Sequence, residues 1–225
     1  MMRSFSSRSD TFVSDEPFYG AYLKDSRDPQ PMADEVIASM DCDWRSVART
    51  MTGPCPANAP IWYQKHMAHH MVGPIAHDDL PGLRHAFLIR DPARVVASYA
   101  NKRVAVRPEH LGVERQVEYF EREADRLGHA PPVIDSADVL GDPPAMLKRL
   151  CEALGIEWDE AMLSWEPGIR ETDGIWAPHW YDAVAASTGF SSPDEHPLEL
   201  DDDSRRVAEA CRPSYERLAK HRLRA

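Results

Sequence analysis

No stretch of this sequence stays apolar over the length that a membrane-spanning helix needs, and its first residues contain no apolar signal core. Cysteine is scarce, with four in the whole chain, and none is part of a C-x-x-C pair. The four lie far apart, at Cys42, Cys55, Cys151 and Cys211. This usage is typical of reduced thiols, so we expect a cytoplasmic protein.

Positive charge is also in deficit, because 26 Lys and Arg face 37 Asp and Glu, which gives a net charge of −11. We therefore expect no nucleic-acid partner and no membrane surface as a partner. Residues 84–107 are the exception, with several cations against Asp91 alone. These cations are Arg84, Arg90, Arg94, Lys102, Arg103 and Arg107. A basic zone in an acidic protein indicates a site for a small anion, or else a solvated helix face.

The order of predicted elements favours an α/β fold with strands alternating with helices. Length suits one domain over residues 1–225, and no internal repeat is visible. Strands are predicted at 11–17, 61–67, 85–90 and 131–136, and helices at 1–7, 32–50, 92–103, 113–127, 142–156 and 202–222, with a loop running into a short helix at 174–190. This alternation predicts three layers, with a central parallel sheet between helices.

The stretch HAFLIRDPARVVASY, residues 85–99, places a cation where a buried strand ends. Arg90 closes the apolar run, and Asp91-Pro92 begins a helix at once. The carboxyl ends of parallel strands and the N-termini of helices are where such folds bind phosphate. Ser98, eight residues after Arg90, is then able to turn toward the same anion. The alternative is a surface Arg90–Asp91 arrangement with a solvent-facing serine, and the residues alone favour neither.

Several separated segments resemble the sulfotransferases that use 3′-phosphoadenosine 5′-phosphosulfate, in a bacterial-type branch. RDPARVVASY is similar to the family's 3′-phosphate segment, with an arginine at 90 and a serine at 98. MMRSFSSRSDTFVSDEPFYGAYL resembles the helix and strand that follow the family's phosphate loop. WYQKHMAHHM and DGIWAPHWYDAVAASTGF resemble later segments. The resemblance implies a P-loop NTPase-like fold with Arg90 and Ser98 on the donor's 3′-phosphate.

The family's first strand and phosphate loop would precede Met1, and no G-x-x-x-x-G-K-[ST] occurs elsewhere. We expect that the recorded start lies too far downstream, inside the first helix; the alternative is a truly shortened, inactive relative. The C-terminal glycine-rich basic motif of the cytosolic branch is missing too. GIWAPHW is then a candidate cover for the nucleotide, with Trp176 stacking on it or serving as a core or lid aromatic.

Sulfuryl transfer needs a base for the acceptor's proton and cations for the sulfuryl oxygens. The resemblance implies Glu16, in the Glu-Pro that follows the first strand, as the base. Asp15 is the neighbouring alternative, although period-2 alternation predicts that it faces the other way. The alternative role for Glu16 is a hydrogen bond to the adjacent loop that fixes the turn. No metal and no redox cofactor is required for this reaction.

His66 is the second candidate for the base, because QKHM resembles the histidine site of cytosolic sulfotransferases. Lys65 is adjacent, so at most one of the two is expected to point into the site, and Lys65 would neutralise sulfuryl charge. A third interpretation is a zinc site of His66 and His70, with His69 nearby. That site requires a helix where the pattern predicts a strand.

The prediction is a sulfotransferase that moves a sulfuryl group from the phosphosulfate donor to a hydroxyl or amine of a small-molecule acceptor. Two alternatives remain. One is a non-catalytic relative that binds adenosine 3′,5′-bisphosphate or only a protein. The other is a small-molecule kinase on the same fold, against which the absent Walker lysine and paired metal-binding acids count. The sequence leaves the acceptor and the oligomeric state open.

Overall fold

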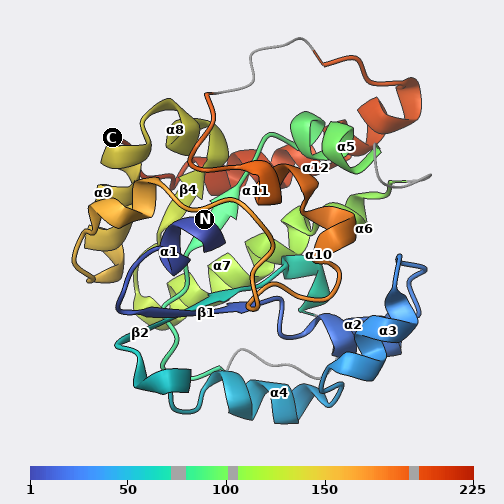
Figure 1. Cartoon of the computed structure of the whole chain (residues 1–225). Helices are drawn as coiled ribbons and strands as arrows, with labels where there is room; N and C mark the ends of the chain where they lie inside the picture. Colours follow the sequence, from blue (N-terminus) through green and yellow to red (C-terminus); the bar gives the residue numbers. More distant parts are fainter. Residues whose placement is uncertain (72–79, 101–105, 193–197) are drawn as a thin grey trace. The chain divides into compact units, whose positions relative to one another are not determined.

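The computed structural model of the protein describes residues 1–71, 80–100, 106–192 and 198–225. The chain forms two compact units, each built from two separate stretches of sequence. Unit 1 contains residues 1–83 and 159–190, and unit 2 contains residues 84–158 and 191–225. The chain, which Figure 1 colours along its length, thus passes from one unit to the other three times.

Unit 1 is organised around two parallel strands, β1 (Thr11–Asp15) and β2 (Ile61–Lys65). Their register sets Thr11 opposite Ile61 and Asp15 opposite Lys65, so both strands end at the same edge. The helices of this unit are α1 (Met2–Ser6), α2 (Tyr19–Ser26), α3 (Ala33–Ser39), α4 (Trp44–Met51), α10 (Ala177–Trp180) and α11 (Asp182–Ala186), with short 3-10 turns η1 (Pro56–Asn58), η2 (Ala68–His70) and η4 (Glu160–Leu163).

The strands of unit 1 form where β-favouring residues meet a buried face. Along β1, Val13 and Asp15 are buried, while Ser14 between them is partly exposed and accepts a hydrogen bond from the Trp62 indole at 2.9 Å. Phe5 of α1 stacks on Tyr63 of β2, with ring centroids 4.4 Å apart. These contacts tie α1 to the sheet.

Unit 2 has its own parallel pair, β3 (Phe87–Ile89) and β4 (Val133–Asp135), with Phe87 opposite Val133. Its helices are α5 (Pro92–Ala100), α6 (Pro108–Leu111), α7 (Val113–Leu127), α8 (Ser136–Gly141), α9 (Pro143–Leu154) and α12 (Asp202–Ala219). The core of unit 2 joins β3, β4, α7 and α12 through Phe87, Ile89, Val113, Val117, Phe120, Val133, Cys211 and Leu218.

Helix boundaries in both units follow local chemistry. Asp135 and Asp201 cap α8 and α12, because each side chain accepts a hydrogen bond from a backbone N–H of the first turn. Helix α7 ends at Gly128, whose φ of 72° places it in the left-handed region that favours glycine. The predicted helix 113–127 is confirmed at both ends.

The single helix predicted over 32–50 is wrong, because the structure has α3 and α4 there instead. Asp41 accepts a hydrogen bond from the Asp43 backbone N–H at 2.9 Å, which turns the chain. Asp43 then caps α4 by accepting from the Ser46 N–H at 2.7 Å. Two aspartates with local hydrogen bonds interrupt the helix that the apolar spacing predicts. The end of the predicted helix 92–103 lies outside the described residues.

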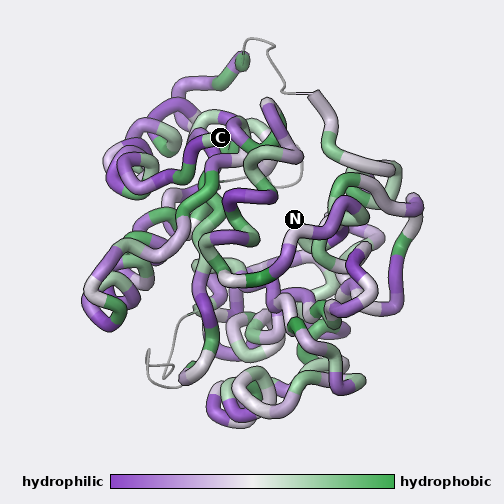
Figure 2. Tube along the Cα trace, turned by 90° about the vertical axis from the view of Figure 1, so that its left-hand side faces the viewer, coloured by the Kyte–Doolittle hydropathy of each residue, from purple (hydrophilic) through white to green (hydrophobic). Residues whose placement is uncertain are grey.

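The α/β fold with parallel strands is confirmed. The described strands pair as two two-stranded parallel sheets, one in each unit, rather than as one continuous ladder. In Figure 2 hydrophobic and hydrophilic residues are mixed along the helices, as expected for helices with one buried face. Among the described residues, no helix combines the length and apolar character needed to cross a bilayer.

Candidate functional site

Two carboxylates and one ammonium meet where β1 and β2 end. Asp15 and Lys65 are the last residues of their strands and register partners. The Glu16 N–H donates to the Lys65 carbonyl at 2.9 Å, which extends the ladder by one bond. The Asp15 carboxylate lies 3.1 Å from the Lys65 Nζ, and Glu16 pairs with the same ammonium. The expected place of Glu16 at the carboxyl end of its strand is confirmed.

The prediction that Asp15 faces away from Glu16 is wrong, and the backbone explains why. Glu16 has a φ of 46°, in the left-handed region that few residues other than glycine adopt. The alternation of a strand therefore stops at Asp15. Both carboxylates then face Lys65, and both are buried, with each residue 8% exposed.

The ammonium of Lys65 is fully used. It donates to Asp15 Oδ1, to Glu16 Oε1 and to the Tyr181 hydroxyl, the last at 2.6 Å. An ammonium has three protons, so three acceptors saturate it. A sulfuryl oxygen that approached Lys65 would have to replace one of these partners.

Tyr181, the residue between α10 and α11, completes the cluster. Its hydroxyl donates to Asp15 Oδ2 at 2.7 Å, and it lies 3.4 Å from Glu16 Oε1. The Gly174 N–H also points at Asp15 Oδ2, at 3.3 Å. Residues 174–181 thus bring a phenol and a backbone amide to the edge of the β1–β2 sheet.

Burial and charge shift the pKa values of this cluster in opposite directions. Burial raises the pKa of Asp15, and the nearby Lys65 only partly offsets that effect. Burial alone would lower the pKa of Lys65, but Glu16 and Asp15 outweigh it, so that pKa lies well above its usual value. Burial also raises the pKa of Tyr181. Lys65 is therefore a fixed cation of the cluster.

His70 lies on the far side of Glu16. Its Nδ1 is 3.5 Å from Glu16 Oε2, which is an electrostatic contact rather than a strong hydrogen bond. Its ring stacks on Tyr19 at 4.4 Å and on Tyr22 at 4.7 Å. Burial, with Lys65 second, moves the pKa of His70 well below its usual value. A neutral imidazole thus faces the carboxylate.

His66 follows β2 but turns elsewhere. Its Nε2 shares a hydrogen bond with the Gln64 side-chain oxygen at 3.1 Å, and its ring lies against Phe18. The zinc interpretation needed a helix that carries His66 and His70 on one face. The structure has the end of β2 and the 3-10 turn η2 there, and no group of three metal-ligating side chains occurs in the part of the chain it describes.

Trp176 is buried in unit 1, at 3% exposure. Its indole N–H points at the Tyr181 hydroxyl at 3.4 Å, and its ring meets Tyr19 edge-on at 5.0 Å. A Cβ on Gly174 would overlap the indole. The indole is therefore packed against protein here, and its stacking on a nucleotide stays a prediction.

Arg90 and Ser98 belong to unit 2. Arg90 follows β3, Ser98 lies in α5, and both side chains are exposed. Asp91 caps α5 by accepting from the Ala93 N–H at 2.9 Å, with Pro92 first in the helix, as the sequence predicts. Neither Arg90 nor Ser98 makes a hydrogen bond or ion pair to another described residue. Both remain available to a ligand.

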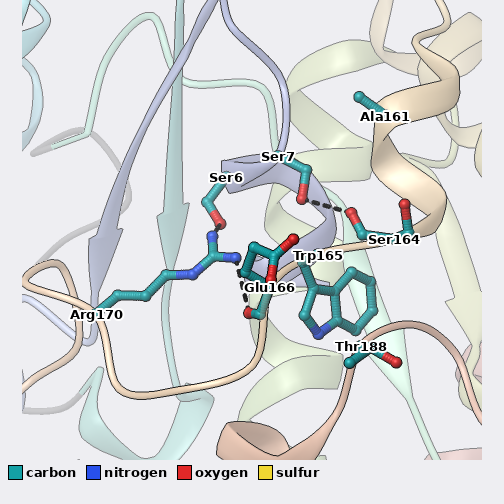
Figure 3. Close-up of a pocket in the computed structure, with 8 residues that line it drawn as sticks. All are labelled: Ser6, Ser7, Ala161, Ser164, Trp165, Glu166, Arg170 and Thr188. Atoms are coloured by element: carbon teal, nitrogen blue, oxygen red, sulfur yellow. Dashed lines mark hydrogen bonds between the residues drawn. The ribbon is translucent and has the colours of Figure 1, made fainter.

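A polar hollow of about 630 Å³ in unit 1 is separate from the cluster (Figure 3). Its lining residues are Ser6, Ser7, Ala161, Ser164, Trp165, Glu166, Arg170 and Thr188. Ser7 donates to the Ser164 carbonyl at 2.9 Å, and Arg170 donates to Ser6. Ser6 and Ser7 precede β1, whereas the cluster follows it, and five strand residues span about 16 Å. Several residues that line the hollow are hydrogen-bonded to one another, so we do not assign the catalytic site to this hollow.

The sequence analysis missed Tyr181 and considered His70 as a zinc ligand, not as a neighbour of Glu16. Tyr181 stands 116 residues from Lys65, and nothing in HWYDA marks its hydroxyl as a partner of a lysine. The local signal is weak: a tyrosine between Trp180 and Asp182, in a segment without a strand pattern or a long-helix pattern. The sequence gives no sign of the contact between His70 and Glu16, because that contact depends on the backbone conformation of Glu16.

Comparison with known proteins gives a family. A family model described as "Sulfotransferase domain" matches residues 1–222. Two Arabidopsis thaliana proteins, branched-chain-amino-acid aminotransferase-like proteins 2 and 1, are each 32% identical to this chain, over 221 and 224 residues. Each alignment covers 98% of this chain and 39% of the plant protein. The chain thus spans about 39% of the length of these curated relatives.

Two solved structures show some likeness to the chain. The sulfotransferase domain from the curacin biosynthetic pathway has a TM-score of 0.40 at 15% identity and covers 86% of this chain and 77% of that one. The sulfotransferase domain from the Synechococcus PCC 7002 olefin synthase has a TM-score of 0.37 at 20% identity, over 85% and 74%. The family assignment does not rest on these two. Because the family model covers nearly the whole sequence, the chain belongs to the sulfotransferase domain family.

Proposed function

We propose that this protein transfers a sulfuryl group from 3′-phosphoadenosine 5′-phosphosulfate to a hydroxyl or amine of a small acceptor. The observation that carries the proposal is the buried pairing of Glu16 with Lys65 where β1 and β2 end. Family membership supports a transferase of this type. The donor and the class of acceptor are the parts that need testing.

Glu16 is proposed as the general base. The acceptor oxygen or nitrogen attacks sulfur, the bond from sulfur to the phosphate oxygen breaks, and its electron pair leaves with adenosine 3′,5′-bisphosphate. The acceptor's proton passes to the Glu16 carboxylate. Lys65 forms an ion pair with that carboxylate and holds it in place. His66 stays the second candidate for the base.

Arg90 and Ser98 are proposed to bind the 3′-phosphate of the donor. Arginine suits this task because its planar guanidinium forms paired hydrogen bonds with phosphate oxygens. The N-terminus of α5, which Asp91 caps, is adjacent in sequence. Trp176 is the candidate for stacking on the nucleotide, provided that the segment around it moves off Tyr19 and Gly174.

Calorimetric titration of the chain with adenosine 3′,5′-bisphosphate tests the donor site. We expect weak binding by the native chain and about tenfold or greater loss in Arg90→Ala, because a charged hydrogen bond contributes about 1.5–3 kcal/mol. Ser98→Ala should lose less. Arg149→Ala is the matched control, since this arginine of the same unit forms a surface pair with Glu152 at 2.5 Å.

Failure of a folded native chain to bind the bisphosphate would refute the donor assignment. Binding that Arg90→Ala leaves intact would refute the residue assignment alone. If binding holds, incubation of the phosphosulfate donor with a panel of small alcohols and amines tests transfer. Bisphosphate release that depends on the acceptor supports the enzyme, and binding without release in any mixture would favour a non-catalytic relative.

A further inference from the structure

We infer that Tyr181 is a positioning residue of this site, which saturates the Lys65 ammonium and orients Asp15 so that Glu16 Oε2 remains the carboxylate oxygen free to act. The contacts on which this rests are those within unit 1 alone. The chemical role of the Glu16 oxygen rests on the proposed function. The orienting role of Tyr181 is independent of that function.

The first step is the direction of each hydrogen bond. Lys65 carries only donors, so the Tyr181 oxygen accepts from it at 2.6 Å. The single phenolic proton is then directed to Asp15 Oδ2 at 2.7 Å, the nearest carboxylate oxygen. The contact to Glu16 Oε1 at 3.4 Å is too long to compete for that proton. Tyr181 thus links the cation to Asp15 through one oxygen.

The second step concerns the two oxygens of Glu16. Oε1 pairs with Lys65, whereas Oε2 lies 3.5 Å from His70 Nδ1 and makes no closer polar contact among the described residues. Tyr181 donates to Asp15 and accepts the third proton of Lys65. Neither group therefore needs a hydrogen bond to Glu16 Oε2. Removal of the hydroxyl leaves one Lys65 proton without an acceptor, and the remaining carboxylate oxygens become its alternatives.

The third step is that the hydroxyl is held in place. The Trp176 indole N–H approaches the Tyr181 oxygen at 3.4 Å, and the Gly174 N–H approaches Asp15 Oδ2 at 3.3 Å. The Lys65 Nζ also lies 4.9 Å from the centre of the Tyr181 ring, so ring and hydroxyl contact the same cation. A tyrosine that only filled space would not need these polar contacts.

The test is the reactivity of Lys65 in Tyr181→Phe, which keeps the ring and removes the oxygen. Pulse acetylation with acetic anhydride, followed by peptide mass spectrometry, reports the rate at each lysine. We expect Lys65 in Tyr181→Phe to react about three- to tenfold faster than in the native chain, since one hydrogen bond of ordinary strength is lost. Lys24, Lys148 and Lys220 serve as internal references for folding.

Tyr215→Phe is the matched control. It removes a tyrosine-to-aspartate hydrogen bond of similar length, 2.6 Å to Asp135, in unit 2. Lys65 should react there as in the native chain. Unchanged Lys65 reactivity in a folded Tyr181→Phe would overturn the inference. If that variant does not melt cooperatively, Tyr181→Phe is measured in an Asp15→Asn background, where a positioning role predicts a smaller effect than in the native background.

A second readout separates this inference from the proposed function. If transfer is measurable, the deficit of Tyr181→Phe relative to the native chain should grow as pH falls. The Tyr181 hydrogen bond lowers the pKa of Asp15, so loss of that bond brings protonation of Asp15 to higher pH. A deficit that is the same at every pH would contradict positioning. Faster Lys65 acetylation without any transfer would leave Tyr181 in its role and overturn the proposed reaction instead.

Discussion

Asp15 and Lys65 are paired both by their backbones and by their side chains. They are register partners across β1 and β2, and their side chains form an ion pair at 3.1 Å. Backbone pairing therefore places the two residues side by side, and the side-chain ion pair forms on that frame. The cluster with Glu16 and Tyr181 is built on this rigid pair, and rigid placement of charge is what catalytic sites require.

Glu16→Gln tests the proposed base. The amide keeps the size of the side chain but does not take a proton, so transfer should fall by about 100- to 10,000-fold. Binding of adenosine 3′,5′-bisphosphate should be unchanged, because that site is assigned to Arg90 and Ser98. The two measurements are the rate of bisphosphate formation and a calorimetric titration. Full activity in Glu16→Gln would shift the assignment to His66.

His70 should make stability depend on pH. Its pKa in the folded chain lies below its unfolded value of about 6.5, so the unfolded chain binds the proton first. Its contribution is thus complete above about pH 6.5 and is lost as pH falls from there toward the folded pKa, by at most about 1.4 kcal/mol per pH unit. Urea unfolding at several pH values, with His70→Gln beside the native chain, measures it.

Asp15 acts in the opposite sense, which makes the comparison with His70→Gln necessary. Its pKa is raised on folding, so its contribution improves as pH falls through the folded pKa toward about 3.8. The difference between the native chain and His70→Gln isolates the histidine. His129→Gln, at an exposed position, is the control and should retain the full native pH dependence. Equal slopes in all three chains would rule out the histidine effect.

Gly174→Ala should damage the segment that carries Tyr181. A Cβ there overlaps the Trp176 indole, and forced overpacking costs about 1–3 kcal/mol. The thermal midpoint should fall, and tryptophan fluorescence should change as the indole shifts. Gly141→Ala is the control, because no atom lies within 4 Å of its Cβ position. A Gly174→Ala chain as stable as Gly141→Ala would contradict the packing described here.

Asp173→Asn should destabilise unit 1 strongly. Arg3 donates to both oxygens of Asp173, at 2.9 and 2.6 Å, and their side chains are 4% and 0% exposed. Removal of one charge from a buried pair leaves the other uncompensated, which costs about 3–5 kcal/mol. Urea unfolding measures the loss. Arg149→Ala breaks only an exposed pair and should shift the midpoint little, so similar midpoints for the two variants would count against the prediction.

The sequence predicts the elements of this protein better than the geometry of its site. Helix α7 is predicted at both ends because Gly128 stops it, and the Asp91-Pro92 start of α5 follows from capping chemistry. The place of Glu16 at the end of β1 follows from the proline that stops the strand. The break between α3 and α4 was missed because two local aspartate hydrogen bonds decide it.

The geometry of the cluster depends on features without a sequence pattern. A left-handed glutamate is uncommon, so the extended pattern of β1 gives no reason to turn Asp15 toward Glu16. Tyr181 arrives from a segment far along the chain whose short helices have weak periodicity. Contacts of that kind depend on tertiary packing, which single-sequence periodicity does not encode.

Because unit 1 is built from two separate stretches of sequence, the residues of the cluster are synthesised at different times. Asp15, Glu16 and Lys65 are synthesised early, whereas Tyr181 follows Lys65 by 116 residues. At a synthesis rate of about 5–20 residues per second, Tyr181 is added roughly 6 to 23 seconds after Lys65. Until then the Lys65 ammonium lacks its third acceptor. A chain that ended at residue 158 would contain Asp15, Glu16 and Lys65 but would lack Tyr181 and the second stretch of unit 1.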